Sequence, residues 1–273
     1  MNGFKTFMLM LLLTVLLIFI GDLIGSRSGM IIGFGIAIIT NFISYFFSDK
    51  IVLASYGAQD VNTNDRLYRI LKDLTMKAGM PMPRVCIVQD NSPNAFATGR
   101  DPHHAAVCAT TGILRILDDN ELEGVLAHEL SHVKNRDILV SSIAAGLCGV
   151  ITILCRIGMI FGGGGEDRRN SGCFTILAIL IGSLAATLIQ LWISRTREYM
   201  ADESGAKMCG KPWALASALS KLARGIENCP MEASTPETRN MFIVNPIAPT
   251  VKNLFSTHPP IEERIKRLNN MHI

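Results

Sequence analysis

Two histidines and a glutamate stand at a spacing that could bind a metal ion and activate water. They are His128, Glu129 and His132, in the pattern His-Glu-x-x-His. On a helix, residues four apart project from the same face, so both imidazoles could reach one zinc ion. Glu129 would then lie beside the metal, placed to take a proton from a water that the metal activates. The pattern is typical of a zinc metalloprotease. The alternative is a surface helix that carries two histidines by chance.

The residues around this motif give it an independent reason to be helical. Asp118 can cap a helix, with Glu121 three residues later, as in a capping box. Apolar residues then repeat at helical spacing, at Leu122, Val125, Leu126, Leu130 and Val133. We therefore predict a metal-binding helix that continues through Asp137. It would be either continuous with, or hinged to, the apolar segment that follows.

A catalytic zinc needs three protein ligands and one open position. We expect Glu198 to be the third ligand, because it begins a helical Glu-x-x-x-Asp pair with Asp202 directly after an apolar segment. Asp202 would bind the second nitrogen of a ligand imidazole and fix its tautomer. The competing interpretation is a solvated helix face balanced by Arg195 and Arg197, and spacing alone does not decide between the two. The other possible ligands are the remaining carboxylates, the cysteines, and His103, His104, His258 and His272.

Four uncharged apolar stretches suggest a membrane protein. They are residues 6–21, 29–47, 138–155 and 170–194, in a chain that is 49% apolar with a mean hydropathy of +0.31. Each is near or above the length that crosses a hydrocarbon layer of about 30 Å. The first resembles a signal peptide but lacks a good cleavage site, so we interpret it as an anchor. We expect two transmembrane hairpins, although the second could instead pack against protein.

The basic residues favour one orientation in the membrane. Both halves of the candidate site must lie on the same side of the bilayer. Basic residues on that side outnumber those on the other: Lys5, Lys50, Lys134, Arg136, Arg195 and Arg197, against Arg27, Arg168 and Arg169. By the positive-inside rule, this excess favours a candidate site that faces the cytoplasm.

Charge and cysteine usage exclude other classes of function. The net charge is only +3, and no basic run is interleaved with aromatic residues, so we expect no nucleic-acid partner. The seven cysteines are odd in number and form no Cys-x-x-Cys pair, which argues against a disulfide framework and for a reducing compartment.

The remaining patterns predict a mainly α fold with a small β-sheet, of the α+β class. We expect helices at 64–77, 195–209, 211–224 and after Pro260, strands at 84–89, 95–98 and 105–110, and a mobile loop at 227–252. The domain organisation would be a transmembrane hairpin at 1–48 and a second hairpin at 138–194. A metalloprotease domain would be split between 49–137, with the zinc helix, and 195–273, with the third ligand.

These motifs together resemble the HtpX family of bacterial membrane zinc proteases, gluzincins related to the CAAX prenyl endopeptidases. The resemblance rests on five features spread over nearly the whole chain. They are the two apolar hairpins, the segment Ser-Pro-Asn-Ala-Phe-Ala-Thr-Gly at 92–99, the zinc motif, the Glu-x-x-x-Asp helix and the closing Thr-His-Pro-Pro at 257–260. The chain keeps the family pattern at every ligand position.

The resemblance implies a membrane-bound metalloendopeptidase with a zincin-like cytoplasmic domain. Its substrates would be misfolded or damaged membrane proteins, it would hold one zinc ion per chain, and Glu198 would be the third ligand. A strand edge beside the zinc helix would bind substrate as an added strand. Asn94, Ala95 and Phe96 match that edge, with Asn94 bonding to substrate backbone. The alternative for Asn94 is a plain loop cap after Pro93.

An oxyanion would need a donor besides the metal. His258, held stiffly before two prolines, is our candidate; the alternative is a structural or exposed histidine. Two other functions compete with quality control: a dedicated processing protease of prenyl-protein or signal-peptide type, and a non-catalytic membrane scaffold. The oligomeric state is not predicted.

Overall fold

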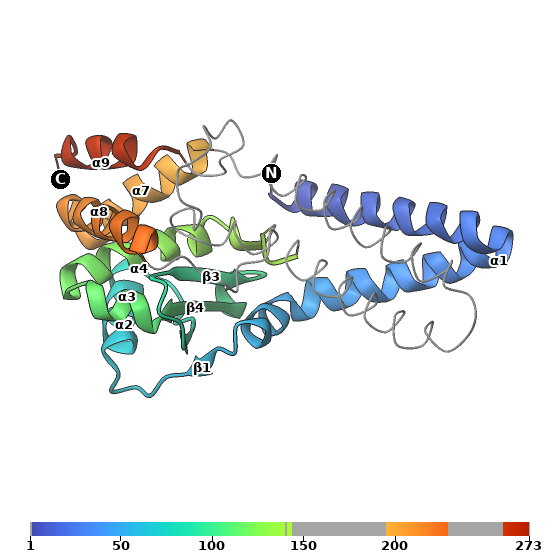
Figure 1. Ribbon diagram of the computed structural model, residues 1–273, viewed down its shortest axis with the longest axis horizontal. Helices are drawn as coiled ribbons and strands as arrows, with labels where there is room; N and C mark the ends of the chain where they lie inside the picture. The colour runs from blue at the N-terminus through green and yellow to red at the C-terminus, as the bar shows by residue number, and fades with distance from the viewer. Residues whose placement is uncertain (1, 140, 144–194, 229–258, 273) are drawn as a thin grey trace.

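A computed structural model describes residues 2–139, 141–143, 195–228 and 259–272. These residues form a mostly helical body around a small mixed sheet, from which a long apolar hairpin projects (Figure 1). Most of the second predicted hairpin lies outside the described residues. So do His258 and nearly all of the predicted mobile loop at 227–252.

The hairpin is the element α1, Asn2–Ser55, which reverses direction at Ser26, where φ is 49°. Its two arms pack closely, because a Cβ added at Gly21 would lie 2.2 Å from the carbonyl oxygen of Gly29. Asn41 joins the arms further along by donating a hydrogen bond of 3.3 Å to the carbonyl oxygen of Met10. The first predicted hairpin is therefore present, with its turn where the sequence placed it.

Membrane-spanning length is found for one arm of α1. Among the described residues, Ser26–Ser55 is the one helix long and apolar enough to cross a bilayer, while Thr6–Phe19 forms a shorter apolar helix. Large apolar side chains on both arms are exposed, including Phe4, Phe7 and Ile31. The prediction of four spanning helices is thus supported for this arm and stays a prediction for the other three.

The sheet has four strands in the order β1-β2-β4-β3. They are β1 (Gln59–Asp60), β2 (Arg84–Val88), β3 (Ala95–Gly99) and β4 (Ala105–Thr110). β2 and β4 are parallel, whereas β3 runs antiparallel to β4 and lies at one edge. The three predicted strands are confirmed; β1 is too short to show a pattern.

Alternation along the strands gives the sheet two buried faces. Ala95, Ala97 and Val107 point to the main core, with Leu67 and Leu71 of α2 (Arg66–Ala78). Their neighbours Phe96 and Cys108 point to the opposite face. The last turns of α1 cover that face, with Val52 and Leu53 buried against it. The apolar hairpin is therefore packed directly onto the sheet.

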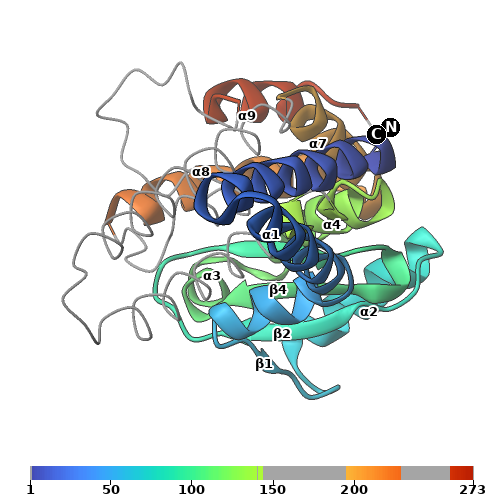
Figure 2. The same ribbon diagram turned by 90° about the vertical axis from the view of Figure 1, so that its right-hand side faces the viewer.

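The helix α4, Asp119–Lys134, lies at the centre of the body. In both views the sheet lies on one side of α4, and α7 (Arg195–Cys209) and α9 (Ile261–Asn269) lie on the other (Figures 1 and 2). Two further helices complete this part of the body. α3 (Thr111–Ile116) follows β4 and was not predicted from the sequence, and α8 (Pro212–Asn228) packs along α4.

Both ends of α4 are defined by specific contacts. At the start, Asp118 and Glu121 form the predicted capping box, and Glu121 also accepts hydrogen bonds from Ser217 and Lys221 of α8, each 2.7 Å long. At the end, Arg136 adopts a left-handed φ of 57°, after which helix resumes at 138. The prediction that this helix continues through Asp137 was wrong, because α4 ends at Lys134 and residues 135–137 form a turn. The helix is instead hinged to the following segment, the second of the two predicted possibilities.

Candidate metal centre

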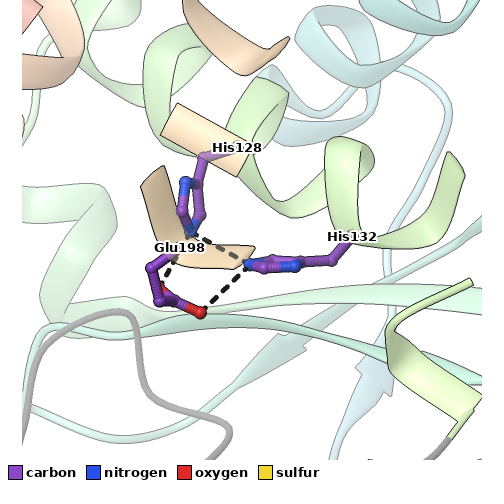
Figure 3. A group of neighbouring side chains, drawn as sticks. All are labelled: His128, His132 and Glu198. Carbon is purple, nitrogen blue, oxygen red and sulfur yellow. Dashed lines mark hydrogen bonds and ion pairs between the residues drawn. The ribbon is translucent and has the colours of Figure 1, made fainter. Parts of the chain in front are cut away.

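The two histidines of α4 point their ring nitrogens at the same place. The Nε2 atoms of His128 and His132 lie 3.2 Å apart, with the rings nearly perpendicular (Figure 3). Their spacing of four residues on a buried helix face produces this convergence, as the sequence predicted. Both side chains are held firmly, because α4 is buried on nearly every side.

Glu198 of α7 completes the group. One carboxylate oxygen lies 3.6 Å from Nε2 of His132 and the other 3.7 Å from Nε2 of His128. The three donor groups fit one ion, since their ligand atoms all lie within 4.8 Å of one another. In a tetrahedral zinc site with bonds of about 2.0–2.1 Å, donor atoms lie about 3.4 Å apart, close to the spacings here.

A glycine allows α7 to approach α4 so closely. A Cβ on Gly205 would lie 2.8 Å from the backbone nitrogen of His128, a distance that real side chains do not adopt. The crossing at Gly205 brings the preceding turns of α7, with Glu198 and Asp202, against the ligand histidines. The two halves of the site, separated in sequence by the second predicted hairpin at 138–194, thus meet at a helix crossing.

Asp202 and Arg264 support the ligands from behind. Nδ1 of His128 lies 2.9 Å from the carboxylate of Asp202, which matches the predicted role of this aspartate. Arg264 of α9 donates two hydrogen bonds to that carboxylate, of 2.8 and 2.7 Å, and lies 3.8 Å from Glu198. Arg264 has an exposure of 0%, and the buried carboxylates of Asp202 and Glu198 lie against its charge.

Asp137 supports the other histidine. Its carboxylate lies 3.5 Å from Nδ1 of His132 and also accepts a hydrogen bond of 3.4 Å from Arg197. Arg197, predicted only as a surface charge, is therefore part of the support of the site. Asp137 and Arg264 were both missed in the sequence. The available signal for Arg264 was its place in the apolar stripe of α9, with Ile261, Ile265 and Leu268.

Burial and neighbouring charges set the protonation of the histidines. Burial lowers the pKa of His128 despite the Asp202 carboxylate, so this imidazole is held in the neutral form that binds metals. Burial would also lower the pKa of His132, but Asp137 and Glu198, with Glu129, raise it to about 9. Burial raises the pKa of Asp202, but Arg264 and His128 together lower it further, so this carboxylate stays ionised.

Glu129 lies between the metal group and β3. It is 6% exposed, and burial together with the Glu198 charge raises its pKa to about 7. The backbone of Ala97 hydrogen-bonds its carboxylate and partly opposes this shift. A carboxylate with a pKa near neutrality can both accept and return a proton, which is what a general base in hydrolysis must do.

The predicted substrate-binding residues lie on the strand next to Glu129. Asn94 is buried just before β3, where Thr110 bonds to both its backbone groups. Ala95 belongs to the face toward the main core, whereas the ring of Phe96 packs against Tyr56 on the opposite face, 5.0 Å away. His103 and His104, two of the other possible ligands, are exposed beyond β3, where Asp101 binds them, and neither belongs to the metal group.

Comparison with known proteins gives consistent matches over the chain. The sequence profile of peptidase family M48 matches residues 61–272. A protease HtpX homolog from Syntrophobacter fumaroxidans is 51% identical, covering 99% of both chains, and one from Pyrococcus furiosus is 53% identical, covering 98% of this chain and 95% of the relative. The crystal structure of Ste24p from S. mikatae has a similar fold, with a TM-score of 0.51 at 16% identity. That match covers 98% of this chain and 65% of Ste24p.

Proposed function

Because the chain belongs to peptidase family M48, we propose that it is a zinc-dependent endopeptidase of the inner membrane that cuts misfolded or damaged membrane proteins. The family membership and the HtpX relatives make it a membrane metalloprotease. The observation that carries the rest is the convergence of His128, His132 and Glu198 beside a buried Glu129.

The three converging residues would hold the zinc ion, one per chain. When bound, zinc supplies a positive charge that lowers the pKa of water toward about 7 and polarises the peptide carbonyl. The donor set favours this ion, because two imidazoles and one carboxylate are typical ligands of catalytic zinc. Asp202 and Arg264 would keep the His128 ring in its binding orientation, through the contacts described above.

Glu129 would move the proton. Its carboxylate would accept a proton from the attacking water as the water oxygen bonds to the scissile carbonyl carbon. Glu129 would then pass this proton to the leaving amine nitrogen as the carbon–nitrogen bond breaks. His258 remains our candidate for stabilising the oxyanion, a role suggested by the sequence.

The edge strand β3 would hold the substrate. Its backbone lies beside Glu129, so a peptide added to this edge would pass the metal group in extended form. We propose the segment Asn94, Ala95 and Phe96, continued by Ala97, as this binding edge.

The location at the membrane follows from the packing of α1 against the sheet. Lys50 and Arg100 lie over the rings of Phe47 and Phe46 at the body end of the hairpin, the arrangement expected at a membrane–water interface. We propose that this end is cytoplasmic and that the protease domain, formed by 49–137 and 195–273, acts there. Protease protection of 59–137 in sealed inside-out vesicles would contradict this orientation.

The experiment that tests the proposed function compares wild-type protein with Glu129→Gln. Gln keeps the shape of Glu129 but cannot accept the proton, so zinc content should stay near wild type while cleavage of an unfolded model protein falls about 10³-fold or more. Glu203→Gln, on the exposed face of α7, is the matched control and should change neither. Undiminished proteolysis by Glu129→Gln would refute the mechanism.

A further inference from the structure

The backbone of β3 offers its outward groups at alternate residues. The Asn94 carbonyl oxygen accepts a hydrogen bond of 2.9 Å from Thr110 of the neighbouring strand. In an antiparallel pair, positions 94, 96 and 98 therefore point their backbone groups toward β4, and positions 95, 97 and 99 point theirs away. The contact between the Ala97 backbone and Glu129 agrees with this register.

The third outward position, Gly99, is already bonded. Its N–H donates a hydrogen bond of 2.9 Å to the hydroxyl of Ser142, and the same hydroxyl lies 2.9 Å from that of Thr98. Ser142 and Thr98 each have an exposure of 0%. Such a buried, doubly bonded hydroxyl occupies the place that a substrate carbonyl would take if an added strand continued past Ala97.

Ser142 belongs to the chain that follows the zinc helix. Residues 138–143, apart from 140, form the helical segment beyond the hinge at Arg136. The chain that carries Glu129 and the metal ligands in α4 therefore contacts β3 a second time, through Ser142 at Gly99, two residues beyond Ala97. This end of β3, where Gly99 bonds to Ser142, also faces the apolar hairpin, because Arg100 follows Gly99 and lies 5.4 Å from the ring of Phe46.

We propose that Ser142 ends the substrate-binding edge, so that β3 pairs with substrate through Ala95 and through the carbonyl oxygen of Ala97, whose N–H is turned to Glu129. This inference rests on the proposed function and deepens it. A substrate chain coming from the membrane would have to pass over Ser142 before joining the strand. Ser142 would thus set the length of extended peptide that the protease grips, and it does so as a positioning residue, without touching the reacting atoms.

The test uses full-length protein in detergent and quenched fluorescent peptides that share one cleavage site. The peptides are lengthened one residue at a time at either end. In the wild type, kcat/KM should level off once the peptide covers Ala97. In Ser142→Ala, the Gly99 N–H is free and the segment at 138–143 is no longer bonded to β3. Peptides that extend past Ala97 at one end should then gain about 2- to 12-fold in kcat/KM, the value of one net backbone hydrogen bond. The gain should lie in KM.

Two variants serve as controls. Ser141→Ala removes a neighbouring hydroxyl that bonds only within its own helix among the described contacts, to the Ile138 carbonyl oxygen, and should keep the wild-type length dependence. Ser142→Thr retains a hydroxyl and should restore that dependence. Zinc content, expected to be unchanged in all three, shows that each variant is folded around its metal site.

The outcomes separate this inference from the proposed function. Cleavage that depends on Glu129 but shows one length dependence in wild type and Ser142→Ala would overturn the role of Ser142 alone. A wild-type enzyme whose kcat/KM rises with each residue added at both ends of the peptide would also overturn it, without use of any variant. Cleavage that does not depend on Glu129 would overturn both.

Discussion

On one side of Glu129 lie charged side chains from α4, α7 and α9; on the other lies the backbone of β3. The metal side is built from charged and polar side chains held at fixed distances from one another, such as Arg264 and Asp202. The strand side is built from small residues and main-chain groups, such as Ala97 and Gly99. The first side should be sensitive to any change of charge, and the second to changes of backbone position.

The largest effect should come from removing the carboxylate ligand. In Glu198→Ala, two histidines remain, which is too few for a tight catalytic zinc site, so zinc content should fall from about one ion per chain to near zero. Plasma mass spectrometry of dialysed protein measures this. The same change at exposed Glu203, the residue after Asp202, should leave the zinc content unchanged. Full zinc occupancy in Glu198→Ala would exclude Glu198 as a ligand.

The next effect concerns the support of the ligands. Arg264→Leu leaves the Asp202 carboxylate buried without its main partner, which should cost about 3–5 kcal/mol of unfolding free energy. Zinc affinity should fall about 10- to 100-fold, as for other groups that orient metal ligands. Thermal unfolding and competition with a chelator measure the two. Lys266→Leu, on the exposed face of α9, should change neither; equal losses in both variants would contradict this account.

The pH dependence of zinc binding should report the charge on His132. Since its pKa is raised to about 9 and only the neutral ring binds metal, one proton must leave on binding at pH 7 to 9. Affinity should therefore increase about tenfold per pH unit over this range and level off above it. Competition titrations with a chelator of known proton affinity measure the slope. A flat profile would show that Asp137 does not hold a proton on this ring.

The mildest effect on the metal should come from the strand side. Thr110 bonds to the backbone of Ser92, Asn94 and Ile113 and so fixes the entry to β3. Thr110→Val should destabilise the protein by about 1–3 kcal/mol, because buried backbone groups lose their partner. Peptide cleavage should weaken while zinc content stays at the wild-type level. Loss of zinc in this variant would show that the two sides are not separable.

The difference between the two sides also explains what the sequence could predict. His128 and His132 lie four residues apart on one helix, so their spacing alone encodes a shared face with Glu129 beside it, and the capping box at Asp118 was confirmed. Glu198 could not be chosen from spacing alone, since its approach depends on the crossing at Gly205, a tertiary contact. The resemblance to a family supplied what local pattern could not.

Other parts of the site left weaker signals. Arg264 is a charge in an apolar stripe, which should have indicated a buried acidic partner. Ser142 gave no signal, because serines within an apolar segment look the same whether or not a hydroxyl caps a strand. The short strand β1 was also missed, because two residues are too few to show the alternation of a strand.

X-ray absorption spectroscopy of the zinc-loaded wild-type protein tests the central claim most directly. Ligation by His128, His132, Glu198 and a solvent oxygen predicts only nitrogen and oxygen neighbours, at about 2.0–2.2 Å, with the outer-shell signature of two imidazoles. The chain carries seven cysteines, so a different site is chemically available. Sulfur scattering at about 2.3 Å, or a single imidazole, would contradict the assignment of the metal centre.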